Sequence, residues 1–362
     1  MSPVESGKKR DEAISDWRFL TGINQEGGEL MRTRYQRGKQ IDHYEILQRL
    51  EQGVASEIYL ARDRRTQREV VLKFPLDEVV GGRATFERYR REATIGKLLH
   101  HPHIQYLLNQ GEKRSQYYLV VEYLRGRTLR TLMREHACAM LPLEDILSIL
   151  TQVGEAVAYA HERGVIHRDI KPENIIVMET GETKIIDFGI ALLENQQTHQ
   201  GWWQSDFSPL VGTPDYMAPE RLCGACGDVR TDIYAIGIIL YELLCGHLPF
   251  EELDGFAFTS QHISYDPPDI RRFAPTLSPA LATVTMRAIR RQPERRYASR
   301  QELLSDLSHL DTVTPLNYLP DPPLLGGRYR HVVHLAFLTL VFCLAIVALS
   351  LLVQMVHQLV VN

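Results

Sequence analysis

Two short motifs near the middle of the chain constrain its fold and chemistry more than any other feature. The segment VIHRDIKPENIIV (Val165–Val177) sets Asp169, Lys171 and Asn174 at fixed offsets between two apolar runs. The segment KIIDFGIA (Lys184–Ala191) follows and carries Asp187 at the end of a predicted strand. The order and spacing of these polar residues predict one site built from two neighbouring loops.

The residue types in these motifs suit the transfer of a phosphoryl group. A carboxylate at Asp169 orients a hydroxyl nucleophile and accepts its proton, and Lys171 neutralises charge beside a γ-phosphate. Mg²⁺ prefers oxygen ligands and takes few of them from a protein, which fits Asn174 and Asp187. We therefore predict a phosphoryl-transfer site that uses ATP and Mg²⁺, with Mn²⁺ as an alternative ion.

The hydrophobic patterning predicts strands first and helices second. Alternating and β-branched apolar residues predict strands within residues 44–72 and 116–124, and a helix is expected over residues 86–99. From Pro142 onward apolar residues recur at helical spacing, and DIYAIGIILYELL (Asp232–Leu244) predicts a central buried helix. This order indicates an α+β fold with two lobes. The net charge of −4 gives no argument for nucleic-acid binding, and we expect none.

The C-terminal part of the chain has a different composition. Leu335–Val353 is 19 residues long without a charged side chain, which would span about 28 Å as a helix, close to one bilayer core. A helix apolar on every face for this length predicts a single membrane span within residues 332–356. Residues 311–331 are rich in proline and glycine and predict a linker. Arg328 and Arg330 place the preceding domain on the cytoplasmic side of a cell membrane.

The two central motifs resemble those of eukaryotic-type (Hanks-type) serine/threonine protein kinases, in their bacterial membrane-anchored branch. The resemblance covers about residues 44–310 and implies a bilobal kinase fold. We expect the kinase domain over residues 41–310, with an N-lobe at 44–121, a hinge at 122–125 and a C-lobe at 126–310. Residues 1–40 form an extension of unknown role. Within VVLK, Lys73 resembles the ligand of the α- and β-phosphates, and Glu92 is its expected ion-pair partner.

The resemblance also implies supporting residues and a nucleotide pocket. In VGTPDYMAPE (Val211–Glu220), Glu220 is expected to pair with Arg296, and Asp232 is expected to brace the catalytic loop. The residues expected to contact the nucleotide are Leu50, Gly53, Ile58, Val71, Lys73, Val121, Glu122, Leu124 and Ile176. Among these, Val121 is the expected gatekeeper, and the backbone of Glu122 and Leu124 is expected to hydrogen-bond the adenine.

Two features depart from the family pattern. In LEQGVASEIYLARD (Leu50–Asp63), Glu51 and Ser56 stand where the family has glycine, so this phosphate loop looks weakened and a raised KM for ATP is expected. Glu51 either faces the anionic ligand or points to solvent. Gly96 replaces a larger apolar residue of the predicted helix, and a gap is expected beside Phe188 and His167. That gap would loosen the helix, so that the active arrangement needs a partner or a homodimer.

We therefore expect a kinase of protein serine and threonine hydroxyls. The placement of Lys171 two residues after Asp169, and Thr213 in the substrate-positioning segment, resemble serine/threonine kinases. Ser205 and Ser208 are the expected sites of autophosphorylation, with Thr198 as a third acceptor. Two alternatives remain. One is a pseudokinase scaffold, which the altered phosphate loop and Gly96 favour and which the intact set of Lys73, Glu92, Asp169, Asn174 and Asp187 disfavours. The other is a small-molecule phosphotransferase of the same fold, which the GTPDYMAPE segment disfavours.

Overall fold

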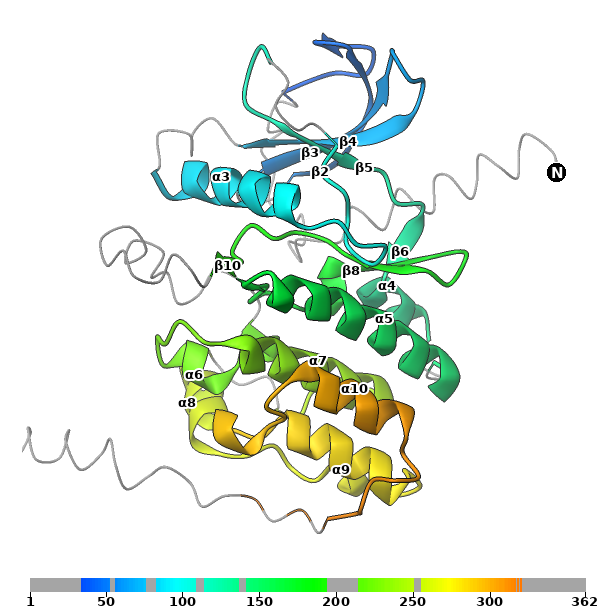
Figure 1. The fold of residues 1–362 in the computed structure, drawn as a ribbon. Coiled ribbons are helices and arrows are strands. Elements are labelled where there is room, and N and C mark those ends of the chain that lie inside the picture. Colours follow the sequence, from blue (N-terminus) through cyan, green and yellow to red (C-terminus); the bar gives the residue numbers. More distant parts are fainter. Residues whose placement is uncertain are drawn as a thin grey trace, which may run out of the picture.

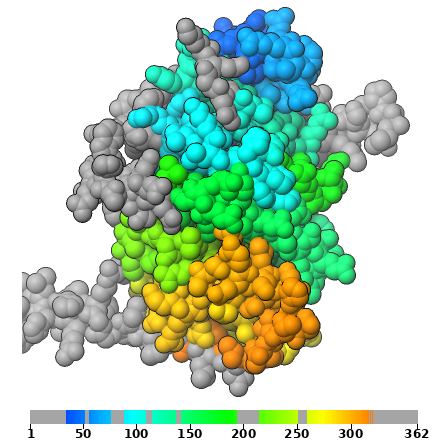
Figure 2. Space-filling model, in the orientation of Figure 1, coloured from blue at the N-terminus to red at the C-terminus, as the bar shows by residue number. Residues whose placement is uncertain are grey.

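The computed structural model describes residues 34–52, 56–75, 83–108, 114–136, 141–193, 214–250, 255–316, 318 and 320. These residues form two lobes, a strand-rich N-lobe and a helical C-lobe joined by one chain segment after β5 (Figure 1). The α+β, two-lobed plan predicted from the sequence is confirmed. In the space-filling view the cyan surface of helix α3 lies against the green surface of the C-lobe (Figure 2).

The N-lobe is built on one antiparallel sheet of five strands in the order β1-β2-β3-β4-β5. Its strands are β1 (Gln40–Ile41), β2 (Tyr44–Gln52), β3 (Ser56–Asp63), β4 (Glu69–Pro75) and β5 (Leu119–Glu122). Successive side chains of β4 point to opposite faces. Leu72 and Phe74 join an aromatic cluster on one face, whereas Val71 faces the cleft between the lobes. Lys73 lies two residues after Val71, so its side chain lies on the same face of the sheet and also points toward the cleft.

Helix α3 (Arg83–Leu98) begins three residues before the predicted helix and covers the sheet beside the cleft (Figure 1). The C-lobe then starts with two small sheets. These contain β6 (Gly126–Thr128), β8 (Ile175–Met178) and β9 (Thr183–Ile185) in one, and β7 (Val165–Ile166) and β10 (Leu192–Leu193) in the other. The helices of the C-lobe are α4 (Leu129–Glu135), α5 (Leu143–Glu162), α6 (Pro219–Leu222), α7 (Val229–Cys245), α8 (Gly255–Ser264), α9 (Pro279–Ala288) and α10 (Arg300–Ser308).

Helix α7 forms the centre of the C-lobe. Every residue from Thr231 to Leu244 is buried, which confirms the central buried helix predicted from the sequence. Asp228 caps its first turn by accepting a hydrogen bond from the Arg230 N–H, and Gly246 ends it in the left-handed conformation at φ 81°. Helices α5, α9 and α10 pack around α7, so its position sets that of the whole lobe.

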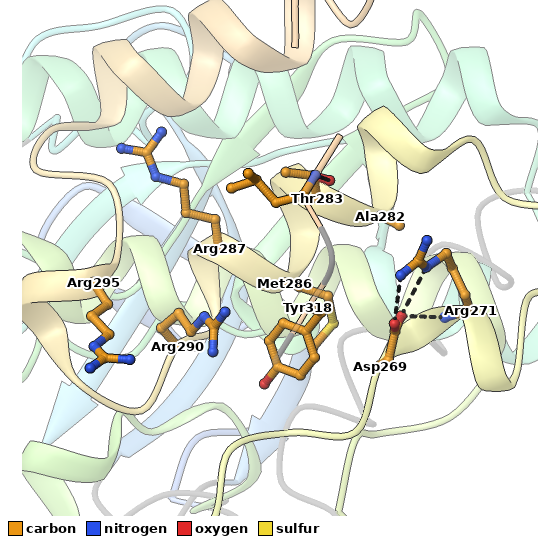
Figure 3. Close-up of a pocket in the computed structure, with 10 residues that line it drawn as sticks. Asp269, Arg271, Ala282, Thr283, Met286, Arg287, Arg290, Arg295 and Tyr318 are labelled. Atoms are coloured by element: carbon orange, nitrogen blue, oxygen red, sulfur yellow. Dashed lines mark hydrogen bonds and ion pairs between the residues drawn. The ribbon is translucent and has the colours of Figure 1, made fainter. Parts of the chain in front are cut away.

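The chain after α10 crosses back over α9 (Figure 3). The Leu316 N–H donates a hydrogen bond to Thr283 Oγ1 at 3.1 Å, and the Tyr318 hydroxyl donates one to the Pro267 carbonyl at 2.9 Å. The start of the predicted linker is thus packed on the C-lobe. Among the residues that the structure describes, no helix has the length and apolar character to cross a membrane, and Leu335–Val353 lies outside them.

The gap expected beside Gly96 is absent. A Cβ atom added to Gly96 would lie 2.9 Å from Leu107 Cβ and 3.0 Å from Leu107 Cδ2, so Leu107 already fills that space. The rings of His167 and Phe188 lie against each other with their centroids 4.5 Å apart. The expectation of a gap was wrong because a residue 11 positions later in the chain supplies the missing volume.

This packing predicts that Gly96→Ala destabilises the fold. Overpacking of this kind costs about 1–3 kcal/mol, and the better helix propensity of alanine returns only about 1 kcal/mol. The free energy of unfolding, measured by urea titration, should therefore fall. Thr94→Ala, at an exposed site of the same helix, is the control and should not lower it. A Gly96→Ala variant as stable as the wild type would contradict this account of Leu107.

Candidate active site

An ion pair between the sheet and helix α3 lies on the N-lobe side of the cleft. Lys73 Nζ of β4 forms a hydrogen-bonded ion pair with Glu92 Oε1 of α3, as the sequence predicted. The same ammonium group lies 3.8 Å from Asp187 Oδ1, which belongs to the C-lobe. Burial opposes the charge, but Asp187 and Glu92 raise the pKa of Lys73 above its usual value. Lys73 therefore links the sheet, the helix and the second motif.

The catalytic loop between β7 and β8 brings the residues of the first motif together. Lys171 Nζ lies 3.1 Å from Asp169 Oδ2. The Asn174 amide donates to the Asp169 carbonyl at 2.8 Å and to its carboxylate at 3.0 Å. Because the NH₂ group makes these bonds, the Asn174 carbonyl oxygen is the atom available to a metal ion. Burial raises the pKa of Asp169, which suits a group that accepts a proton.

Asp187 follows β9 in a strained backbone conformation at φ 63°. Its carboxylate accepts a hydrogen bond from the Gly189 N–H at 3.1 Å, and a Cβ atom at Gly189 would lie only 3.0 Å from that carboxylate. Burial opposes ionisation, but Lys73 and Arg88 hold the pKa of Asp187 well below its usual range. The carboxylate is therefore charged and held in one orientation, as a metal ligand requires.

Asp232, in the first turn of α7, holds the catalytic loop through hydrogen bonds to its backbone. Its carboxylate accepts hydrogen bonds from the His167 N–H at 2.9 Å and the Arg168 N–H at 2.8 Å. Nε2 of His161 lies 2.7 Å from the same carboxylate. Arg168 is held at φ 70°, an unfavourable backbone conformation for a residue with a side chain. The bond to its N–H stabilises this conformation in the residue directly before Asp169.

The apolar residues predicted for the nucleotide pocket lie together. They form one buried cluster that contains Leu50, Ile58, Val71, Val121, Leu124 and Ile176. Strands β2 to β5 and the segment after β5 contribute five of them, and β8 of the C-lobe contributes Ile176. The cluster thus bridges both lobes, with apolar walls that suit a flat aromatic base. Gly53 lies outside the described residues.

The hinge is tied to a segment that the sequence analysis did not identify. The Glu122 N–H donates to the Tyr106 carbonyl at 3.0 Å, and the Gln105 side chain donates to the Glu122 carbonyl at 2.9 Å. That carbonyl keeps one lone pair for a ligand. The Glu122 carboxylate also pairs with Lys184 at 2.9 Å. Gln105 and Tyr106 belong to no motif, and Lys184 begins the second motif without a predicted role. Their role at the hinge comes only from where the fold places them.

Glu51 points inward. The residue is 8% exposed, and its Oε2 atom has no hydrogen-bond partner among the described residues. Burial raises its pKa to about 8. Of the two orientations open at the level of sequence, the structure has the one that faces the cleft.

The ion pair predicted between Glu220 of the substrate-positioning segment and Arg296 is also formed. Arg296 Nη2 lies 2.7 Å from Glu220 Oε2, and Arg296 Nη1 lies 2.8 Å from Glu220 Oε1. The Arg296 side chain is fully buried, so this pair ties α6 to the turn that precedes α10. Thr198, Ser205, Ser208 and Thr213 lie outside the described residues.

A separate cavity of about 200 Å³ lies between α9 and the returning C-terminal segment (Figure 3). It contains none of the predicted site residues. Three of the arginines that line it pair with acidic residues: Arg271 with Asp269, Arg287 with Glu302, and Arg290 with Asp266. The Arg290 guanidinium also lies 4.2 Å from the centroid of the Tyr318 ring. The contact between Arg290 and Tyr318 helps to hold the C-terminal segment on the C-lobe. The candidate active site lies elsewhere, in the cleft between the lobes.

We predict that Asp232→Asn lowers the free energy of unfolding by about 2–4 kcal/mol at pH 7, because buried N–H groups lose a charged acceptor. Hydrogen bonds from His161 and the Arg168 N–H hold the pKa of Asp232 below its usual value despite burial. The contribution of the Asp232 carboxylate to the free energy of unfolding is therefore fully present above the unfolded-state pKa of 3.8. It is lost as the pH falls through the lower pKa of the folded state.

The difference between wild type and Asp232→Asn should accordingly shrink below about pH 4 in urea titrations. Asp145→Asn, at an exposed site in the first turn of α5, is the matched control and should leave the free energy of unfolding close to that of the wild type at both pH values. An Asp232→Asn difference that stays constant from pH 7 to pH 3 would argue against this role.

The comparisons with known proteins agree with this geometry. Residues 44–307 match the family model described as protein kinase domain. The chain is 33% identical over 275 residues to the serine/threonine-protein kinase PrkC of Bacillus subtilis, and 32% identical over 278 residues to PknB of Mycobacterium leprae. These matches cover 75% and 76% of this chain, but only 41% and 44% of the relatives.

The solved structure of the PknI kinase domain of Mycobacterium tuberculosis is also similar. It superposes with a TM-score of 0.61 at 26% identity, covering 77% of this chain and all of that domain. Together with the geometry of the cleft, these matches establish that the chain belongs to the protein kinase family.

Proposed function

We propose that this chain is a serine/threonine protein kinase that transfers the γ-phosphoryl group of ATP to protein hydroxyls. The contact of Lys73 with both Glu92 and Asp187 carries this proposal. It brings the phosphate-binding lysine, its helix partner and the metal-binding carboxylate into one arrangement, which active protein kinases require.

The residues of the cleft divide the reaction among them. The apolar cluster binds the adenine, and the hinge backbone at Glu122 and Leu124 supplies its hydrogen bonds. Asp169 orients the substrate hydroxyl and accepts its proton. Lys171, whose Nζ lies 3.1 Å from Asp169 Oδ2, stabilises charge on the transferring group. Each residue is held by a neighbour, so little rearrangement precedes the transfer.

The donor set fits Mg²⁺, with Mn²⁺ as an alternative. Asp187 supplies an ionised carboxylate, and the carbonyl oxygen of Asn174 is the free end of an amide whose NH₂ group is bound to Asp169. Hard oxygen donors from only two residues are typical of a Mg²⁺ site completed by phosphates. Asp187 and Asn174 would hold a Mg²⁺ ion that supplies neutralisation of the phosphate charge.

The choice of a serine or threonine hydroxyl rests on the catalytic loop. Lys171 follows Asp169 by two residues, as in the serine/threonine kinases that this chain resembles. Among the relatives, PrkC and PknB are named serine/threonine-protein kinases. We infer the same substrate class here and leave the identity of the protein substrate open.

We also propose that the C-terminus tethers the kinase to a cell membrane through a single span, with the kinase domain in the cytoplasm. Leu335–Val353 carries no charge over 19 residues. Arg328 and Arg330 precede it, which favours a cytoplasmic position for that end. A homodimer formed through this segment is a further part of the proposal.

The first test is autophosphorylation of the full chain with radiolabelled ATP and Mg²⁺. We expect transfer by the wild type and a loss of about 10²–10⁴-fold in Asp169→Asn, the range that one general base contributes. Lys73→Met should lose activity as well. Lys97→Met, on the exposed face of α3, is the matched control and should keep it. Wild-type protein that transfers no phosphate to itself or to a generic protein would favour the pseudokinase scaffold.

A second test concerns the segment before Thr213. We expect autophosphorylation at Ser205 or Ser208, because the Arg168 side chain beside Asp169 suits a phosphate partner. Phosphopeptide mapping of active protein should find one of the two serines modified, and a Ser205→Ala, Ser208→Ala double variant should be several-fold less active. Active protein with neither serine modified would refute this assignment.

A further inference from the structure

The side chain of Glu51 stands out among the buried groups that the proposed mechanism does not use. It lies at the end of β2, where its partner in the sheet register is Ile58 of β3. Only 8% of the residue is exposed, and Oε2 makes no hydrogen bond within the described part of the chain. A buried carboxyl oxygen without a partner costs free energy, so the arrangement calls for an explanation.

The charged groups around Glu51 come from three different elements. Lys73 of β4, Lys171 of the catalytic loop and Asp187 after β9 all act on it electrostatically. These are the groups assigned above to the α- and β-phosphates, the γ-phosphate and the metal ion. Glu51, Ile58 and Lys73 are consecutive register partners across β2, β3 and β4. This row of residues sets the Glu51 carboxyl group at the phosphate end of the cleft, whereas its neighbour Leu50 belongs to the apolar cluster at the adenine end.

The protonation state of Glu51 determines whether its carboxyl group attracts or repels a phosphate group. Burial raises its pKa to about 8, while Lys73 and Lys171 favour the carboxylate and Asp187 opposes it. At neutral pH the group is mainly a neutral acid, whose hydroxyl can donate one hydrogen bond to a phosphate oxygen. As a carboxylate it donates none and repels the phosphates. A charge-based rise in the KM for ATP, as the sequence suggested, is therefore expected only at alkaline pH.

We propose that the Glu51 carboxyl group contacts the phosphates of the bound nucleotide and is a determinant of how tightly this chain binds a triphosphate. The proposal rests on the proposed ATP site and adds a residue that the family pattern does not supply. Glu51 acts on the phosphates alone, so it distinguishes nucleotides from nucleosides. Glu51 stands at a position of the phosphate loop where the family has glycine, so its side chain would make a phosphate contact in place of one from the glycine backbone.

The test compares the dissociation constants of ATP and adenosine for the full chain at pH 6.5 and pH 9, in EDTA. The variants are Glu51→Gln, which keeps the shape of the neutral acid, and Glu45→Gln, a control on the same strand. A group with a pKa near 8 is about one-tenth neutral at pH 9, so wild-type ATP affinity should fall about tenfold from pH 6.5. In Glu51→Gln the ATP affinity should change much less between pH 6.5 and pH 9, whereas Glu45→Gln should show the same tenfold decrease as the wild type.

Adenosine should bind equally well at both pH values to all three proteins, since it carries no phosphate. Equal pH dependence of ATP binding in the wild type and Glu51→Gln would overturn the proposal, as would a shift that adenosine shares. Adenosine binding without ATP binding, or no binding of either ligand, would instead count against the proposed ATP site. Thermal unfolding of each variant verifies that the protein is folded at both pH values.

Discussion

The contact between Asp232 and the catalytic loop is the interaction on which the rest of the site depends. One carboxylate, 1% exposed, accepts the N–H groups of His167 and Arg168 from the first turn of a helix whose middle is wholly buried. Because the packing of the C-lobe fixes α7, it also fixes the position of the catalytic loop that is hydrogen-bonded to Asp232. Asp169 then follows a strained residue, Arg168, whose backbone N–H is held by Asp232.

The second constraint is that both lobes build the site. Lys73 belongs to the N-lobe sheet, yet the Asp187 carboxylate of the C-lobe lies 3.8 Å from it. The nucleotide cluster has the same character, since β8 supplies Ile176 beneath residues of the N-lobe strands. Lys184 of the C-lobe strand β9 pairs with the hinge residue Glu122 at 2.9 Å and adds a third connection. A relative movement of the lobes would therefore change nucleotide binding and catalysis together.

Two departures from the family pattern have different consequences in the structure. Gly96 removes a side chain from α3, but Leu107 occupies that volume and the Lys73–Glu92 pair still forms. Glu51 adds a side chain where the family has none, and burial changes its chemistry from that of an anion to that of a neutral acid. The first substitution is compensated by packing, while the second alters the site itself. Neither departure removes a group that the reaction needs, which is why the kinase assignment outweighs the scaffold alternative.

The sequence by itself determined the family, the two-lobed plan and the identity of the polar residues at the site. Those residues lie in short motifs, where local chemistry and spacing are enough to recognise them, and α7 was recognisable from its continuous apolar run. Only the tertiary structure decided the inward orientation of Glu51, the filling of the space at Gly96 and the roles of Gln105, Tyr106 and Lys184. Each of these depends on contacts between segments distant in the chain, and such contacts leave no pattern within either segment. Volume and burial are properties of the assembled core, so they appear only when the chain has folded.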